Sequence, residues 1–126
     1  MDQIRFAAIE QFKMLCATRN DSKLVPGAYK AFRAIKDTED KQYRRIGDGE
    51  VVMEDFCWDN EREDFIVTLR ALKIKSMVIT NTSSGLFDDL HGYAGLGCKL
   101  VDLCVIGRWD RWMQKEEDVK GIRFEL

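Results

Sequence analysis

The chain has 126 residues, of which 45% are hydrophobic and 33% charged, and its 20 basic and 22 acidic side chains give a net charge of −2. These values predict one soluble globular domain and exclude an intrinsically disordered chain. Because basic and acidic residues are nearly equal in number, the chain has no overall positive field that would attract nucleic acid. No apolar run approaches the roughly 18 residues of a membrane span, and the first residues lack the apolar stretch of a signal peptide, so we expect a cytoplasmic protein.

Four cysteines and one histidine are too few and too dispersed for a metal site. No CxxC pair is present, whereas zinc needs Cys and His at short spacing. Cys98 and Cys104 lie on one predicted strand, about 20 Å apart along it, too far for a disulfide. We therefore expect reduced thiols, no bound metal and no cofactor.

Two helices are predicted at the start of the chain. Residues 2–18 place apolar side chains on one face at the helical period, and Pro26 suits the first turn of a second helix. The polar stretch Asp37–Glu50 follows, as a frayed helix end or as a linker. We divide the single domain, 1–126, into an N-terminal helical hairpin, 1–48, and an α/β core, 50–126.

Helices and strands alternate in the core, where Asn60–Ile74 is the clearest helix. Asn60 is its predicted N-cap, with Glu63 completing a capping box, and Phe65, Leu69 and Leu72 form its buried stripe. Gly95 and Gly97 are expected to end the next helix in the left-handed conformation. Its predicted apolar face is Leu86, Leu90 and Ala94, with Phe87 alongside. The predicted strands are Val51–Trp58, Met77–Thr80, Cys98–Trp109 and Val119–Leu126.

This pattern gives the order α-α-β-α-β-α-β-β and predicts an α+β fold with an α/β-like core. Its small mixed sheet is covered by helices and ends in a C-terminal antiparallel hairpin. The last strand of that hairpin is expected to form a sheet edge that could pair with another copy.

A polar turn between a predicted strand and a predicted helix is the first candidate binding site. It consists of Asn81, Thr82, Ser83, Ser84 and Gly85. Backbone amides and hydroxyls at such a junction can hold a phosphate or a carboxylate. No phosphate-binding motif accompanies them, and capping of the next helix by Thr82 or Ser83 explains the same residues, so we favour capping.

The next candidate is the group Asp88, Asp89 and His91. Asp88 and His91 share a predicted helix face three residues apart, which suits acid–base chemistry. With Ser83 and Ser84 nearby, they suggest a small hydrolase. The GxSxG sequence of a nucleophile elbow is missing, and a surface Asp–His pair is the favoured interpretation.

The second candidate binding site is the sequence Arg108-Trp109-Asp110-Arg111-Trp112. Aromatic rings beside arginines are typical of surfaces that bind a protein or stack on unpaired bases. Alternatively, Trp109 packs in the core and Trp112 covers a loop. The acids Glu116, Glu117 and Asp118 would weaken attraction to phosphates, so Arg108, Trp109, Arg111 and Trp112 are better suited to a protein partner.

The segment from about Val51 to Leu126 resembles an uncharacterised family of small proteins from mobile elements and phages of gut Firmicutes. The matching residues are Asp64-Phe65, Thr68-Leu69, Thr80–Leu86, Leu90-His91, Gly97-Cys98-Lys99 and Gly121–Phe124. The family has no established activity, so the resemblance transfers no catalytic residues. It implies an accessory protein of mobile DNA, and the N-terminal helices lie outside it.

Three functional hypotheses follow. We favour a non-enzymatic protein that binds a host or competitor protein, for example an inhibitor of a host defence nuclease in the manner of an anti-CRISPR protein. The second is a nucleotide- or nucleic-acid-binding module that uses Asn81–Gly85 or Arg108–Trp112. The third is the small hydrolase with Ser83, Ser84, Asp88 and His91. The oligomeric state is left open.

Overall fold

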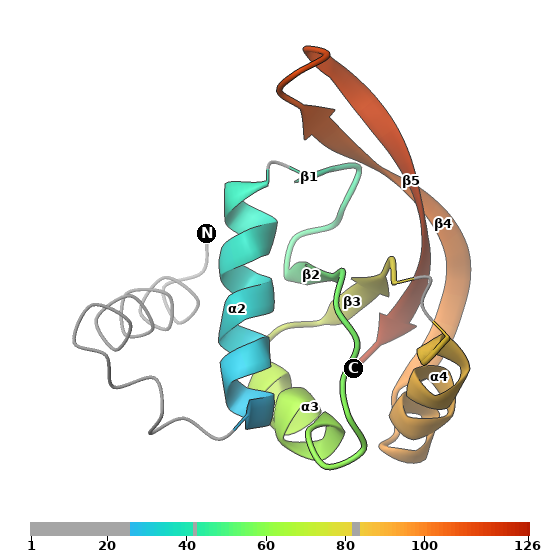
Figure 1. Cartoon of the computed structure of the whole chain (residues 1–126). Helices are drawn as coiled ribbons and strands as arrows, with labels where there is room; N and C mark the ends of the chain where they lie inside the picture. Colours follow the sequence, from blue (N-terminus) through green and yellow to red (C-terminus); the bar gives the residue numbers. More distant parts are fainter. Residues whose placement is uncertain (1–25, 42, 82–83) are drawn as a thin grey trace, which may run out of the picture.

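The computed structural model describes residues 26–41, 43–81 and 84–126; the predicted helix 2–18 lies outside these ranges. The described part contains three helices and a five-stranded mixed sheet (Figure 1), which confirms the predicted α+β class, the element order and the C-terminal hairpin. The elements are α2 (Pro26–Asp40), β1 (Tyr43–Arg44), β2 (Glu50–Met53), α3 (Arg62–Ala71), β3 (Ser76–Ile79), α4 (Leu86–Gly95), β4 (Lys99–Asp110) and β5 (Lys115–Glu125).

The strand order in the sheet is β1-β4-β5-β3-β2. β2 and β3 are parallel and are connected through α3, whereas the other neighbours are antiparallel. β5 lies between β4 and β3, so the prediction that the last strand forms a sheet edge is wrong. The long β4–β5 hairpin continues beyond the other strands as a curved arm (Figure 1).

The main hydrophobic core lies between one face of the sheet and the three helices. Alternate residues of β2, β3 and β5 point to that face, because side chains along a strand alternate in direction. Tyr93 of α4 joins the layers, since its ring packs beside both Phe65 of α3 and Phe124 of β5. The sheet contributes Val51, Met53, Met77, Ile79 and Phe124, and α2 and α3 contribute Ala31, Ala34, Ile35, Phe65, Ile66 and Leu69.

The two helices that follow strands begin differently from the prediction. Glu61 takes the N-cap position of α3, which corrects the predicted cap at Asn60, and its carboxylate accepts the backbone N–H of Trp58 at 3.1 Å. Gly85, instead of Thr82 or Ser83, takes the N-cap position of α4. Gly97 follows α4 with φ of +85°, in the left-handed region that glycine adopts without strain, as predicted.

The buried side of α4 is polar at one position, which the apolar pattern did not predict. Asp89 and Tyr93 are its buried residues, whereas Phe87 and Ala94 of the predicted apolar face are exposed. Leu86 and Leu90 are partly buried against the core, so only part of the predicted face is correct. Within the described ranges, no helix has the length and apolarity needed to cross a membrane.

The second face of the sheet carries a smaller core and a buried charge. Val52, Val78 and Ile106 are fully or almost fully buried there. Beside them, the Glu50 carboxylate accepts hydrogen bonds from Arg123 Nε and from the Ser76 hydroxyl, both at 2.7 Å. Burial disfavours the charge on Glu50, but these hydrogen bonds outweigh it and lower the pKa of the carboxyl group.

We expect Glu50→Gln to lower the free energy of unfolding at neutral pH by about 1–2 kcal/mol, because Arg123 loses its buried anionic partner. A carboxyl group whose pKa is lower in the folded state contributes stability above its unfolded pKa, and this contribution disappears as the pH falls through its folded pKa. The difference between wild type and variant should therefore shrink from pH 7 toward pH 3 in urea unfolding. Glu125→Gln, at an exposed position of β5, is the control and should leave the pH profile unchanged. Parallel profiles for Glu50→Gln and wild type would contradict this role of Glu50.

Candidate functional site

The tip of the β4–β5 hairpin forms the best-defined exposed site. The strands pair in register up to Asp110 and Lys115, and residues 111–114 form the turn between them. Asp110 Oδ1 accepts the backbone N–H of Trp112 at 2.9 Å and that of Met113 at 3.2 Å. Gln114 has a φ of +50°, which completes the reversal. Asp110, the last residue of β4, therefore fixes the conformation of the turn through these two hydrogen bonds.

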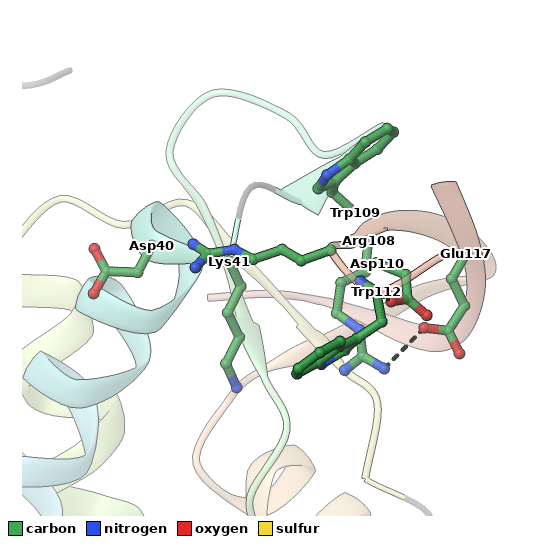
Figure 2. A pocket seen from close by; sticks show the side chains of 8 residues that line it. Asp40, Lys41, Arg108, Trp109, Asp110, Trp112 and Glu117 are labelled. Atoms are coloured by element: carbon green, nitrogen blue, oxygen red, sulfur yellow. Dashed lines mark hydrogen bonds and ion pairs between the residues drawn. The ribbon is translucent and has the colours of Figure 1, made fainter. Parts of the chain in front are cut away.

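This turn presents two large apolar side chains to solvent. Trp112 is 96% exposed and Met113 63% exposed. Beside them lies a hollow of about 380 Å³ (Figure 2). The two arginines and two tryptophans predicted as a site all line it, together with four further residues; the lining residues are Asp40, Lys41, Arg108, Trp109, Asp110, Arg111, Trp112 and Glu117.

Ion pairs fix the base of the arm to the body of the domain. Arg108 bridges Glu117 on β5, at 3.1 Å, and Glu54 in the segment after β2, at 2.9 Å. Glu54 also accepts hydrogen bonds from Tyr43 and from Lys41. The hydrogen bond to Glu117 and the nearby Glu54 raise the pKa of Arg108, which stays charged. Arg108 therefore positions the arm, and its charge is already balanced by two carboxylates.

The two tryptophans of the site do not form one aromatic surface. The indole rings point away from each other (Figure 2). Trp109 is partly buried, and the Arg44 guanidinium of β1 lies over its ring at 5.7 Å, a cation–π contact. Trp109 is thus neither in the core nor at the tip, and Trp112 does not cover a loop. The exposed part of the site is the turn that carries Arg111, Trp112 and Met113.

The other predicted binding site, Asn81–Gly85, is divided between two places. Asn81 lines an apolar hollow of about 320 Å³ against β4 and β5. Gly85 lines a different hollow, of about 670 Å³, between the segments that follow β2 and β3. Ser84 is exposed, and Thr82 and Ser83 lie outside the described residues.

The residues predicted for a hydrolase do not assemble in the described structure. His91 is exposed and packs edge-to-face on Phe87, with ring centroids 4.7 Å apart. Asp88 is exposed in the first turn of α4, and no hydrogen bond joins it to His91 among the residues described. Asp89, its neighbour in sequence, is the buried carboxylate.

A buried polar cluster around Asp89 was not predicted. Asp89 is 1% exposed, and its Oδ1 accepts a hydrogen bond from Arg62 Nε at 2.9 Å. The same arginine donates to Asp59 at 2.7 Å on the exposed side, while the backbone N–H of Cys57 donates to Asp89. Burial raises the pKa of Asp89, with Arg62 opposing that effect. Asp89 was predicted only as part of the Asp88, Asp89 and His91 group; its i, i+4 spacing with Tyr93 on α4 is the sequence signal for the buried cluster.

This cluster lacks an active nucleophile. Burial raises the pKa of the Cys57 thiol to about 11, so the thiol is protonated at neutral pH. Burial also raises the pKa of Tyr93, whose hydroxyl lies beside that thiol. In the described part of the chain, no group of three or more His, Cys, Asp and Glu is arranged to hold a metal ion. The cluster connects the loop after β2 to α3 and α4, which is a structural role.

The fold therefore defines the class of the protein: an α+β domain with a mixed five-stranded sheet and an extended hairpin arm. The chain belongs to the family of a domain of unknown function (DUF7698), which matches residues 28–126. Membership of a family without known activity is thus confirmed. This match includes most of α2, whereas the predicted resemblance began at about Val51. No curated protein and no solved structure matches the chain.

Proposed function

We propose that this protein is a non-enzymatic binding protein whose hairpin tip engages a protein partner with an apolar pocket. The observation that carries the proposal is the exposure of Trp112, 96%, on a turn held by Asp110. Exposed tryptophans are enriched among the residues that dominate binding energy, because a large rigid ring loses little conformational entropy on burial. The turn is already ordered, which reduces the entropic cost of association further.

The charges of the arm favour a protein over a nucleic acid. Between Arg108 and Asp118 there are three basic and four acidic side chains. Arg108 is paired with Glu54 and Glu117, and Arg45 with Asp118 at 2.6 Å. Phosphate binding needs several uncompensated cations on one surface, whereas here the acids outnumber the bases. An apolar contact at Trp112 and Met113, with Arg111 at its rim, fits a protein surface better.

The proposal includes two further parts: that the protein comes from a mobile element, and that its partner is a host defence nuclease that it inhibits. Neither the fold nor the family identifies the partner. The proposal requires only that the partner be a protein and that Trp112 be inserted into it. The affinity of such a contact depends on the ring and on the turn that orients it.

Trp112→Ala tests the proposal. Partners are captured from a host lysate on the immobilised full chain and identified by mass spectrometry, and the purified partner is then titrated by calorimetry. We expect Trp112→Ala to weaken its affinity about 30-fold or more, because the anchor of the contact is lost. Trp58→Ala is the matched control, since Trp58 is 61% exposed on the loop after β2, outside the arm.

Two results would overturn the proposal. In one, the purified partner binds wild type and Trp112→Ala equally. In the other, no protein binds saturably, and single-stranded oligonucleotides quench Trp112 fluorescence with an affinity that falls steeply with salt, which would place the protein in the nucleic-acid-binding class.

A further inference from the structure

The outer edge of β4 is open over most of its length. Among the described residues, β1 pairs with β4 only at Gly107 and Arg108, whereas β5 pairs with β4 along its other side. Lys99–Ile106 therefore presents a row of backbone N–H and C=O groups with no neighbouring strand in the described structure. Such groups accept an added β-strand readily.

This edge also carries apolar side chains. Leu103 is 77% exposed and Val105 48% exposed, and the two point to the same face of the sheet. That face is the one covered by the helices, because Leu103 lies opposite Ile122, which packs against the main core. Next to them is the hollow of about 320 Å³ that Leu86 and Ile122 also line. Sheet edges are commonly protected by charge, proline or a bulge. This edge carries Lys99, Asp102 and one irregularity, between Leu100 and Asp102, but the segment Leu103–Ile106 has no charged residue and no proline.

We propose that β4 is an interface between two copies of this chain, which pair antiparallel across a two-fold axis and join their sheets. A symmetric interface requires a surface complementary to itself, and the open edge has this property. The irregularity at one end and β1 at the other limit the regular open segment to Asp102–Ile106, whose midpoint is Cys104.

Placing the axis at Cys104 defines the register. Leu103 of one copy then lies opposite Val105 of the other, and Val105 opposite Leu103. Directly opposed residues of an antiparallel pair share a face, so these exposed apolar side chains cover one another. Asp102 lies opposite Ile106 and not opposite another acid, and its charge is already balanced by Arg123 at 3.2 Å. No like charges meet in this register.

The same register brings the two Cys104 residues together. Opposed Cα atoms of an antiparallel pair are about 4.5–5.5 Å apart, within the range that a disulfide bridges. Cys104 is a free, partly exposed thiol. Its cross-linking by an added oxidant therefore reports the register and not only association. The interface leaves the hairpin tip uncovered, so a dimer would present two copies of it.

The experiment measures the oligomeric state of the full chain by sedimentation velocity at concentrations up to about 1 mM. We expect a dimer whose dissociation constant rises at least about tenfold in Leu103→Lys/Val105→Lys, because opposed lysines repel and the apolar contact is lost. Val67→Lys is the matched control, since Val67 is 55% exposed on α3 and should leave the dimer intact. Circular dichroism verifies that both variants are folded.

Copper–phenanthroline oxidation tests the register. Wild type and Cys98→Ser should give a covalent dimer on a non-reducing gel, and Cys104→Ser should not. A chain that stays monomeric over the whole concentration range would overturn the proposal. So would a dimer that is insensitive to Leu103→Lys/Val105→Lys, or one that oxidant does not link through Cys104.

Discussion

Asp89→Ala is expected to lower the free energy of unfolding by about 3–4 kcal/mol. The change leaves the Arg62 side chain, 11% exposed, without its buried carboxylate partner, and leaves the Cys57 backbone N–H without its acceptor. Removing one member of a buried pair costs more than the pair itself contributes, since the remaining charge stays desolvated. Chemical denaturation at neutral pH measures the loss.

Asp59→Ala is the matched control for Asp89→Ala, because Asp59 binds the same arginine. Its side chain is 92% exposed, against 2% for Asp89, so only a solvated ion pair is lost. We expect a change of less than about 1 kcal/mol. Asp89→Asn should fall between the two, because the amide oxygen can still accept the Cys57 N–H. Equal losses for Asp59→Ala and Asp89→Ala would show that burial does not govern this cluster.

Gly27→Ala is expected to destabilise the domain by about 2–3 kcal/mol, because Gly27 of α2 lies directly against the first turn of α3. An added Cβ would lie 2.7 Å from the Asp64 Cβ and 2.8 Å from the Phe65 backbone nitrogen. The backbone cannot rotate away from such a contact as a flexible side chain can, so α2 must shift. The shift would separate Ala31 and Ile35 from the core that they share with α3.

Gly95→Ala is the control and should have the opposite sign. Gly95 is the last residue of α4, and a Cβ there would have no atom within 4 Å. Alanine is favoured over glycine in a helix by up to about 1 kcal/mol, so this variant should be slightly more stable than wild type. Thermal unfolding of both variants measures the comparison. A rise in melting temperature for Gly27→Ala would show that the helices tolerate the added methyl group.

The elements predicted correctly are those in which apolar residues recur at helical or strand spacing within the element itself. Phe65, Ile66 and Leu69 recur at the helical spacing and are buried in α3, and alternation identified β5. β1 was missed because it is two residues long within a polar stretch and pairs with Gly107 and Arg108, far away in sequence. Such a strand is determined by its partner and not by its own propensity.

The polar side of α4 could not be predicted for a related reason. From the sequence alone, Asp89 is predicted to lie at the surface, because burying a carboxylate without a partner costs too much free energy. Its partner, Arg62, comes from a different helix, so only the tertiary structure reveals the compensation. The C-terminal hairpin that carries the tip was predicted correctly, because its second strand alternates locally between apolar and charged residues. The Glu54–Arg108 link that holds the arm was not visible in any local pattern.

The central position of β5 has a consequence for how the chain can fold during synthesis. β2 and β3 on one side, and β4 on the other, are connected in the sheet only through residues 115–125. A nascent chain on the ribosome therefore holds two separate fragments until those residues emerge from the exit tunnel. Assembly of the complete sheet is then a late step that requires β5, and no stable native-like intermediate is expected earlier in translation.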